Sequence, residues 1–164
     1  MPRTFRSAIL MLAAVLLVAG RNPISAVSAQ AKDIVETAIA AGSFKSLVAA
    51  VRAADLVAQL KSAGPFTVFA PNDEAFAKIP KADLDALLKD KVKLAKVLTH
   101  HVFAGNANSD DLKMLKDLSV VDGGRLPILV DKGSLRVGGA LVIKADIVAT
   151  NGLIHVVDTV LIPK

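Results

Sequence analysis

The spacing of apolar residues changes along the chain. It is typical of helices before about residue 115 and of strands after it. Apolar residues at intervals of three and four predict helices over residues 32–41, 44–51 and 56–60, and further helices that begin near residues 82, 92 and 109. Gly42 is a natural end for the first helix. Ser43 is the expected N-cap of the second.

The stretch 64–80, GPFTVFAPNDEAFAKIP, predicts the element around which the rest of the chain packs. Phe66 to Ala70 are mostly apolar strand formers, as expected for a strand buried on both faces. Pro71 ends the strand, and Asn72 stands at the N-cap position of a short helix. Asp73 follows in the first turn, where a negative charge suits the helix dipole. A buried strand that turns directly into a capped helix makes a rigid corner.

The strands are expected mainly in the last third of the chain. Asn151-Gly152 predicts a hairpin with a type I′ turn, because both residues tolerate the positive φ that this turn demands. Helices grouped first and strands grouped last indicate an α+β fold rather than alternating α/β. The pattern predicts strands over residues 100–103, 120–121, 126–130, 135–137, 141–143, 146–149 and 153–162.

Residues 1–31 have the pattern of a signal peptide. Arg3 and Arg6 precede an apolar run over residues 8–19, small residues follow, and cleavage is expected after Ala29 or Ala31. A membrane anchor is the alternative, but this run has 12 residues, whereas a span needs about 20. Residues 32–164 are therefore expected to form a single domain, secreted or periplasmic. The chain has no cysteine, so packing holds this domain together without disulfides.

Removal of the signal peptide changes the charge of the protein. Three of the 20 Lys and Arg residues lie in that segment, so 17 remain against 15 Asp and Glu, and the net charge falls from +5 to +2. The chain has no Tyr or Trp on which bases could stack. These features predict that nucleic acid is not a partner.

Three segments together resemble the fasciclin-type domain family, over essentially the whole of residues 32–164. The first conserved box of the family is similar to GPFTVFAPNDEAF at 64–76, and the second is similar to TNGLIHVVDTVLIP at 150–163. Between them the family carries a Tyr-His pair, for which this chain has LTHHVFAG at 98–105. His101 aligns with the family histidine, and His100 replaces the tyrosine. The short signal and the single domain resemble a bacterial member.

This resemblance implies a wedge or sandwich of two small β-sheets flanked by several helices. It also implies an exported, non-catalytic adhesion or interaction module without a cofactor, whose partner is an envelope or extracellular protein or polysaccharide. The residues of the family motifs are expected to be mainly structural. They are Thr67, Asn72, Asp73, His101, Asn151, Gly152, His155 and Asp158.

The polar residues of these motifs have ordinary structural explanations. Thr67 is expected to satisfy a buried hydrogen bond, and Asn72 and Asp73 to cap a helix. His101 and His155 each fall in an expected strand, where a structural role competes with a pH-sensitive or partner-facing one. On a strand, His100 and His101 would point to opposite faces, so the two could not ligate one metal, and no metal site is predicted.

Asp146 and Ile147 are the candidate partner contacts. In some animal relatives, integrin-recognition sequences carry an Asp-Ile pair just before the second box, and here the pair lies in KADIV at 144–148. The acidic residue and the proline that precede the pair in one such motif are absent, and an integrin is not expected to be the partner. Because an Asp beside a β-branched residue is also common at a strand edge, a structural role is the alternative.

Other classes of function find less support in the sequence. The chain has no Gly-x-Ser-x-Gly motif, no cysteine nucleophile and no phosphate-binding glycine loop, so a hydrolase would need a site assembled only in three dimensions. A carrier of a lipophilic small molecule would need an internal cavity. A single domain with one binding face cannot bridge two surfaces, so we expect either weak self-association or service as a soluble partner.

Overall fold

The central feature of the fold is the parallel pairing of β1 (Phe66–Pro71) with β7 (Gly152–Val157). The computed structural model describes residues 32–163, and the expected signal peptide with its cleavage after Ala29 or Ala31 lies outside them. Phe66 lies opposite Gly152 at one end of the pair, and Pro71 lies opposite Val157 at the other. The two box-like segments of the sequence therefore share one pair of strands.

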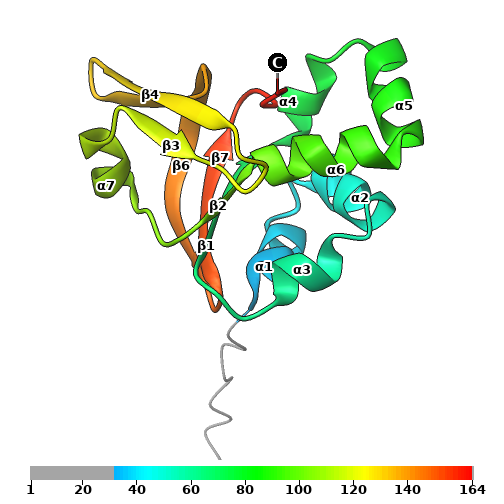
Figure 1. The fold of residues 1–164 in the computed structure, drawn as a ribbon, viewed down its shortest axis with the longest axis horizontal. Helices are drawn as coiled ribbons and strands as arrows, with labels where there is room; N and C mark the ends of the chain where they lie inside the picture. The colour runs from blue at the N-terminus through cyan, green and yellow to red at the C-terminus, as the bar shows by residue number, and fades with distance from the viewer. Residues whose placement is uncertain (1–31, 164) are drawn as a thin grey trace, which may run out of the picture. The chain divides into compact units, whose positions relative to one another are not determined.

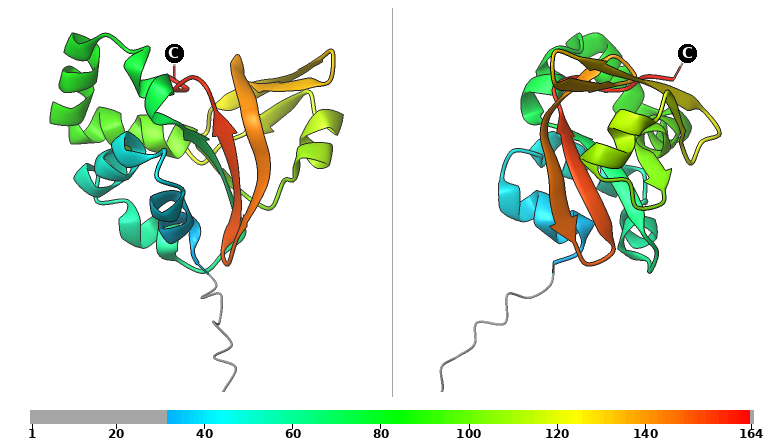
Figure 2. Two further views of the ribbon diagram at one scale, coloured as in Figure 1. Left: turned by 180° about the vertical axis from the view of Figure 1, so that it is seen from behind. Right: turned by 90° about the vertical axis from the view of Figure 1, so that its left-hand side faces the viewer.

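The other strands extend this pair on both sides. They are β2 (Val102–Ala104), β3 (Asp117–Ser119), β4 (Arg125–Asp131), β5 (Ser134–Val137) and β6 (Ala140–Ala149), in the order β2-β1-β7-β6-β5-β4-β3. β6 pairs with β5 at its start and, after shifts of register, with β7 along the rest of its length. The two small sheets that we expected are the two halves of this order, joined through β6 (Figures 1 and 2).

The two ends of the strand order also meet. The Val121 N–H, just after β3, donates a hydrogen bond of 2.9 Å to the Val102 carbonyl at the start of β2. The Phe69 N–H of β1 donates to the His101 carbonyl at 2.8 Å. The bond between Val121 and Val102 gives the sheet a barrel-like closure without a regular ladder between β2 and β3, whereas the bond between Phe69 and His101 continues the pairing of β1 with β2.

Seven helices cover the described part of the chain, and the predicted helical segments are confirmed. In Figure 1, α1 to α6 lie on one side of β1 and β7, and α7 lies on the other side beside β3. The α+β class, with a helical first half and a strand-rich second half, is thus confirmed. The helices are α1 (Ile34–Ala41), α2 (Lys45–Ala53), α3 (Val57–Lys61), α4 (Asp73–Ala77), α5 (Lys81–Lys89), α6 (Lys91–His100) and α7 (Ser109–Met114).

Alternate side chains of β1 enter two different hydrophobic cores. Val68 and Ala70 pack with the helices in the first core, and Phe69 packs within the curved sheet in the second. On β7, Ile154 belongs to the first core and Val157 to the second. This two-sided burial explains why β1 reads as a nearly continuous apolar run.

Several expected boundaries were wrong. α6 continues to His100 and His101 caps it, so the strand expected over residues 100–103 begins only at Val102. β3 ends at Ser119, before the expected strand at 120–121. The strands expected over 141–143 and 146–149 are one strand, β6.

The last strand is shorter than the 153–162 expected. β7 ends at Val157, because Asp158 turns to bond with Leu141 through both its backbone and its carboxylate. At the N-terminal end of α2, the N-cap is Phe44 rather than Ser43, and no side chain of the cap residue bonds to the helix. None of the helices within residues 32–163 is long and apolar enough to span a membrane.

Candidate functional site

Thr67 is buried in β1 and fastens the loop that follows β2. Its hydroxyl donates to the Gly105 carbonyl at 2.8 Å and accepts from the Ala107 N–H at 3.0 Å. Both hydrogen-bonding roles of the hydroxyl are therefore used inside the fold, and Thr67 is 0% exposed.

Asn72 and Asp73 cap two different helices. The Asn72 side chain accepts from the Ala75 N–H at 2.8 Å and so caps α4, the helix that it begins. The Asp73 carboxylate instead accepts from the Ser46 N–H at 2.9 Å, in the first turn of α2. Burial acts to raise the pKa of Asp73, but the hydrogen bonds from Ser46 outweigh it and hold the pKa below its usual value. Asp73 thereby takes the capping role that we had assigned to Ser43.

Asn151 and Gly152 join the β6–β7 hairpin to the helices and to β1, but not through a type I′ turn. Among the described residues that are not glycine, only Asp55, Lys132 and Asp146 have positive φ. Asn151 therefore does not have the positive φ that a type I′ turn requires, and the predicted turn type was wrong. The Asn151 side chain accepts from the Ile34 N–H at 3.0 Å and donates to the Leu60 carbonyl at 2.6 Å.

Gly152 is required by the closeness of β1. A Cβ at this position would lie 1.8 Å from the Phe66 carbonyl oxygen. The hairpin loop itself is Thr150-Asn151, because Ala149 pairs with Gly152.

Asp158 fixes the end of β7. Its carboxylate accepts from the Leu141 N–H at 2.9 Å and forms an ion pair of 3.2 Å with Lys78. Burial acts to raise the pKa of Asp158, and the hydrogen bonds from Leu141, Thr159 and Lys78 more than offset it, so that the pKa is lowered.

His101 is a buried and neutral histidine at the end of α6, not on a strand. Its Nδ1–H donates to the Val97 carbonyl at 2.7 Å, and its Nε2 accepts from the Leu161 N–H at 2.8 Å. These two partners fix the tautomer. Burial lowers the pKa of His101 to about 4.

His155 uses both nitrogens in the same way on β7. Its Nε2–H donates to the Ala107 carbonyl at 2.8 Å, and its Nδ1 accepts from the Asp146 N–H at 3.2 Å. The ring stacks on Phe69 with a centroid distance of 5.6 Å. Burial lowers the pKa of His155, so neither His101 nor His155 offers a free nitrogen for catalysis or for a metal.

Asp146 and Ile147 lie in the irregular middle of β6. Asp146 has a left-handed φ of 58°, and its carboxylate accepts from the Ser109 N–H at 2.8 Å and from the Ser109 hydroxyl at 2.5 Å. These bonds lower the pKa of Asp146. Ile147 packs partly against the helical core, whereas the next side chain, Val148, is 76% exposed. Asp146 therefore attaches α7 to β6, and Val148 is the most exposed apolar group of the strip 144–148.

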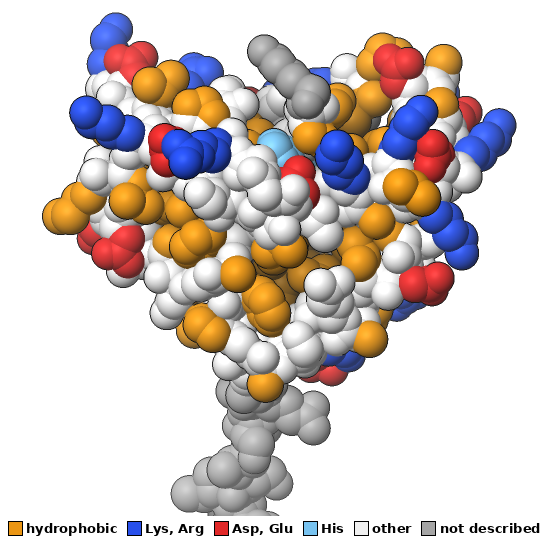
Figure 3. All heavy atoms as spheres, viewed as in Figure 1, with side chains coloured by type: hydrophobic (Ala, Val, Ile, Leu, Met, Phe, Trp, Pro, Cys, Tyr) orange, Lys and Arg blue, Asp and Glu red, His pale blue; other side chains and the backbone are white. Residues whose placement is uncertain are grey.

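An apolar pocket opens between the first three helices and β1. It is lined mainly by aliphatic side chains of α1, α2 and α3, with Phe66 and Val121 at its edge, and holds about 60 Å³. Figure 3 shows hydrophobic side chains gathered around this hollowed part of the surface. Ligand sites for drug-sized molecules hold about 300 Å³ or more, so this pocket accommodates a small group rather than a whole lipophilic molecule.

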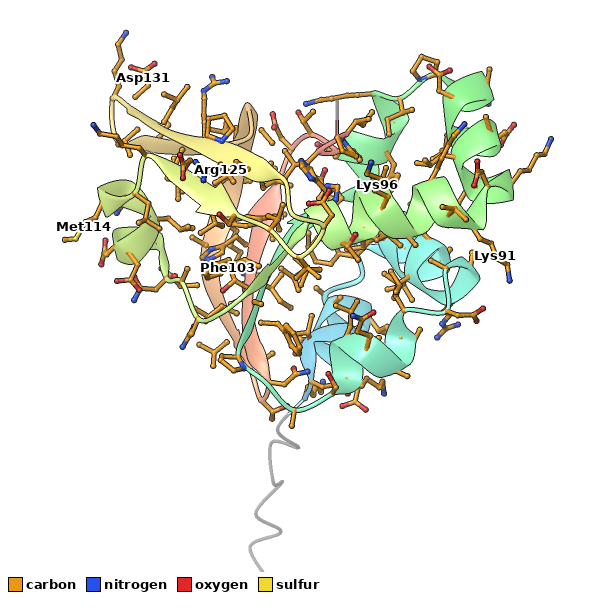
Figure 4. All side chains as sticks on the ribbon, viewed as in Figure 1. Lys91, Lys96, Phe103, Met114, Arg125 and Asp131 are labelled. Carbon is orange, nitrogen blue, oxygen red and sulfur yellow. The ribbon has the colours of Figure 1, made fainter. Side chains whose placement is uncertain are left out.

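A larger polar groove, of about 530 Å³, lies where α6, the turn after β3 and the C-terminal segment meet. His100 and Asp122 both line it, with a distance of 2.8 Å between His100 Nδ1 and the Asp122 carboxylate. Lys96 on α6 and Arg125 on β4 also line it, and both lie on the face turned to the viewer in Figure 4.

Sequence reasoning missed this groove, because its residues come from four separate segments of the chain. The only signal was local, namely His100 in place of the family tyrosine and the turn Asp122-Gly123-Gly124. Within residues 32–163 there is no cluster of three His, Asp or Glu side chains that could hold a metal ion.

Comparison with known proteins agrees with the fold and the motifs. A family model described as the fasciclin domain matches residues 42–163. Two proteins of Synechocystis sp. are similar: sll1483, 44% identical over 81% of this chain and 74% of its own, and sll1735, 45% identical over 79% of this chain and 97% of its own.

The fold matches a solved structure as well. A FAS1 domain pair from the insect cell adhesion molecule Fasciclin I superposes with a TM-score of 0.60 at 21% identity, over 74% of this chain and 46% of that chain. At this identity the match concerns the arrangement of helices and strands.

Proposed function

Because the chain belongs to the fasciclin domain family, we propose that it is an exported, non-catalytic interaction module that recognises an envelope or extracellular protein or polysaccharide through its surface. The solved relative is a cell adhesion molecule, which supports an adhesive or binding role. We also propose that residues 32–164 act as a single domain after removal of the signal peptide.

The main support for this proposal is that the polar residues of the family motifs form hydrogen bonds inside the domain. Hydrogen bonds to backbone groups of the same chain occupy the polar side chains of Thr67, Asp73, His101 and His155. A catalytic base or nucleophile needs a free atom that faces the substrate. The motif residues thus stabilise the fold, and we propose that other residues, on the outer surface, bind the partner.

We propose the strip 144–148 of β6, which contains Asp146 and Ile147, as a contact surface for a protein partner. Asp146 sets the local shape through its bonds to Ser109. Val148 supplies the exposed apolar side chain beside Ile147. An exposed aliphatic group on a shaped strand is a suitable anchor for a protein interface.

Capture of envelope components by the immobilised protein tests this surface. Val148→Lys should reduce capture about fivefold, the effect of losing one important interface side chain. Val92→Lys is the matched control, because Val92 is 79% exposed on α6, away from the strip. Equal capture by the two variants would remove the strip from the proposal, and no capture by the unmodified protein would contradict recognition itself.

Export is tested separately by fractionation and N-terminal sequencing. The mature chain should begin at Gln30 or Lys32 and be found in the periplasm or the medium. An intact N-terminus in the membrane fraction would indicate an anchor instead. Sedimentation at working concentration tests weak self-association, which bridging between surfaces would require.

The apolar pocket supports a second candidate, a carrier of a lipophilic molecule. Its walls are aliphatic, but its 60 Å³ would admit only the end of an acyl chain. Thermal shift with palmitate and with a lipid panel separates the two functions. A saturable rise of several degrees would favour the carrier, and an unchanged melting temperature would favour the interaction module.

A further inference from the structure

Building on the proposed recognition function, we propose that the polar groove beside His100 binds an anionic polysaccharide segment, through its carboxylate or sulfate groups and its hydroxyls. The groove is distinct from the strip on β6 and from the apolar pocket. It contains the one histidine whose ring nitrogens are not both bonded within residues 32–163.

The His100 ring is held rigidly and presents one nitrogen to the groove. The Asp122 carboxylate accepts from His100 Nδ1–H at 2.8 Å through one oxygen and from the Gly124 N–H at 2.8 Å through the other. The His100 side chain is only 9% exposed, but its Nε2 is not sealed from solvent and has no bonding partner within residues 32–163. The residue lines the groove, and Nε2 is the ring nitrogen that is left to bond a ligand.

Gly124 makes this placement of the ring possible. A Cβ at Gly124 would lie 2.7 Å from His100 Cε1, so any larger residue would push the ring away from Asp122. The ring, the carboxylate and the glycine turn therefore form one preorganised unit. With its proton on Nδ1, His100 can accept a hydrogen bond from a sugar hydroxyl at Nε2.

Two cations stand at the sides of this unit. Lys96 lines the groove one turn before His100 on α6 and has no ion-pair partner within residues 32–163. Among the described residues Arg125 is paired only with Asp117, at 3.8 Å and with both side chains largely exposed, so an incoming anion can replace that contact. The Asp122 carboxylate bonds to His100 and to the Gly124 N–H and is 7% exposed, so little of its negative charge faces a ligand.

The chemistry of the groove favours an acidic glycan over other ligands. Neutral sugars usually stack on aromatic side chains, but the chain has no Trp or Tyr, and no Phe lines the groove. A protein partner would seek a closed apolar pocket for an anchor side chain, whereas this groove is open and its lining includes the side chains of Lys96, His100, Asp122 and Arg125. Cations around a polar, open groove of about 530 Å³ suit a charged, hydroxyl-rich chain.

Calorimetry and ¹H–¹⁵N NMR of the purified protein at low salt test this proposal. The probes are an oligogalacturonate, a sulfated dextran oligosaccharide, a neutral dextran oligosaccharide and an oligoglutamate. The two acidic sugars should bind and shift the resonances of the His100 ring and of the Gly123 and Gly124 amides, and the neutral sugar should not bind. The first two arms distinguish carboxylate from sulfate as the recognised group.

Charge variants then locate the site. Lys96→Gln and Arg125→Gln should each weaken binding about threefold to fivefold, and the double variant about tenfold or more. Lys113→Gln on α7 makes the same change in net charge away from the groove and should retain the affinity of the unmodified protein. Circular dichroism confirms that each variant folds.

The proposal would be overturned if Lys96→Gln and Lys113→Gln lost the same affinity for the acidic sugars. It would also be overturned if no sugar bound, or if the neutral sugar bound as tightly as the acidic ones. Tighter binding of oligoglutamate than of the acidic sugars would overturn it as well and would indicate an acidic peptide as the ligand. Capture of envelope material that persists in the double variant would leave the recognition function standing and refute only the groove as its site. Absence of capture by the unmodified protein would instead refute the recognition function.

Discussion

The Leu161 N–H donates a hydrogen bond of 2.8 Å to His101 Nε2, which ties the C-terminal segment to the end of α6. The other ring nitrogen donates to Val97, so this geometry requires a neutral ring. A proton added to Nε2 would replace an acceptor with a second donor and break the bond to Leu161. The stability of the fold is thereby linked to pH.

We predict that the free energy of unfolding decreases as the pH falls from about 6.5 to about 4. The pKa of His101 is lowered from 6.5 to about 4 in the folded state, so within this window the unfolded chain binds a proton that the folded chain does not. His101 alone should account for a loss of about 3 kcal/mol, and His155, whose pKa is also lowered, acts in the same direction. Urea unfolding followed by circular dichroism at several pH values measures this slope.

The carboxylates act in a lower pH window and so do not obscure this effect. The pKa values of Asp73, Asp122, Asp146 and Asp158 are lowered from 3.8, so their contribution to stability is present above about pH 4 and is lost below it. His101→Gln, whose amide offers a donor and an acceptor but does not titrate, should lose most of the slope. A constant free energy between pH 7 and pH 4.5 would mean that the folded state accepts the proton.

Asp73→Ala should destabilise the fold by about 1 to 2 kcal/mol, because it removes the cap of α2. Glu74→Ala is the matched control, since Glu74 is an exposed acidic residue in the same first turn of α4. It should cost less than about 0.5 kcal/mol. Equal losses in chemical denaturation would assign the effect of Asp73 to the helix dipole of α4 rather than to α2.

Gly152→Ala should prevent folding or reduce stability severely, since the added Cβ would collide with the Phe66 carbonyl where β1 and β7 begin to pair. Gly133→Ala meets no atom within 4 Å and costs only the left-handed backbone conformation, about 1 kcal/mol. Expression level and melting temperature compare the two variants. Similar melting temperatures would show that β1 and β7 can move apart without penalty.

Asp146→Ala should lower stability by about 2 kcal/mol, because α7 loses both of its bonds to β6. Asp146→Asn should cost less, since Asn tolerates the left-handed φ and still accepts from the Ser109 N–H. A double-mutant cycle with Ser109→Ala isolates the coupling between the two side chains. A coupling energy near zero would mean that the bonds to Ser109 do not stabilise the fold, and that the Asp146 carboxylate is available to a partner.

The sequence predicted well those parts of the fold that depend on local periodicity. The strand at Phe66, the cap at Asn72 and the helices all follow from neighbouring residues. Spacing alone misassigned His100 and His101, because residues 100–103 read as one strand although α6 continues to His100 and β2 begins at Val102. It also misread Asn151, whose side chain serves α1 and α3 instead of its own turn.

The candidate site could not be predicted in the same way, since its groups meet only in three dimensions. Asp73 bonds to a helix 27 residues earlier in the chain. Asp122 bonds to His100 across 22 residues. The spacing of residues along the chain does not predict such pairs. The motif residues that look functional in the sequence are those whose side chains make hydrogen bonds within the fold.

The position of β7 in the middle of the strand order has a consequence for biosynthesis. Until β7 has been made, β1 and β6 are two open edges, and β7, the last of the described strands along the chain, fills the gap between them. The central part of the sheet thus cannot close before β7 has been made, so folding of the sheet waits for the last of the described strands.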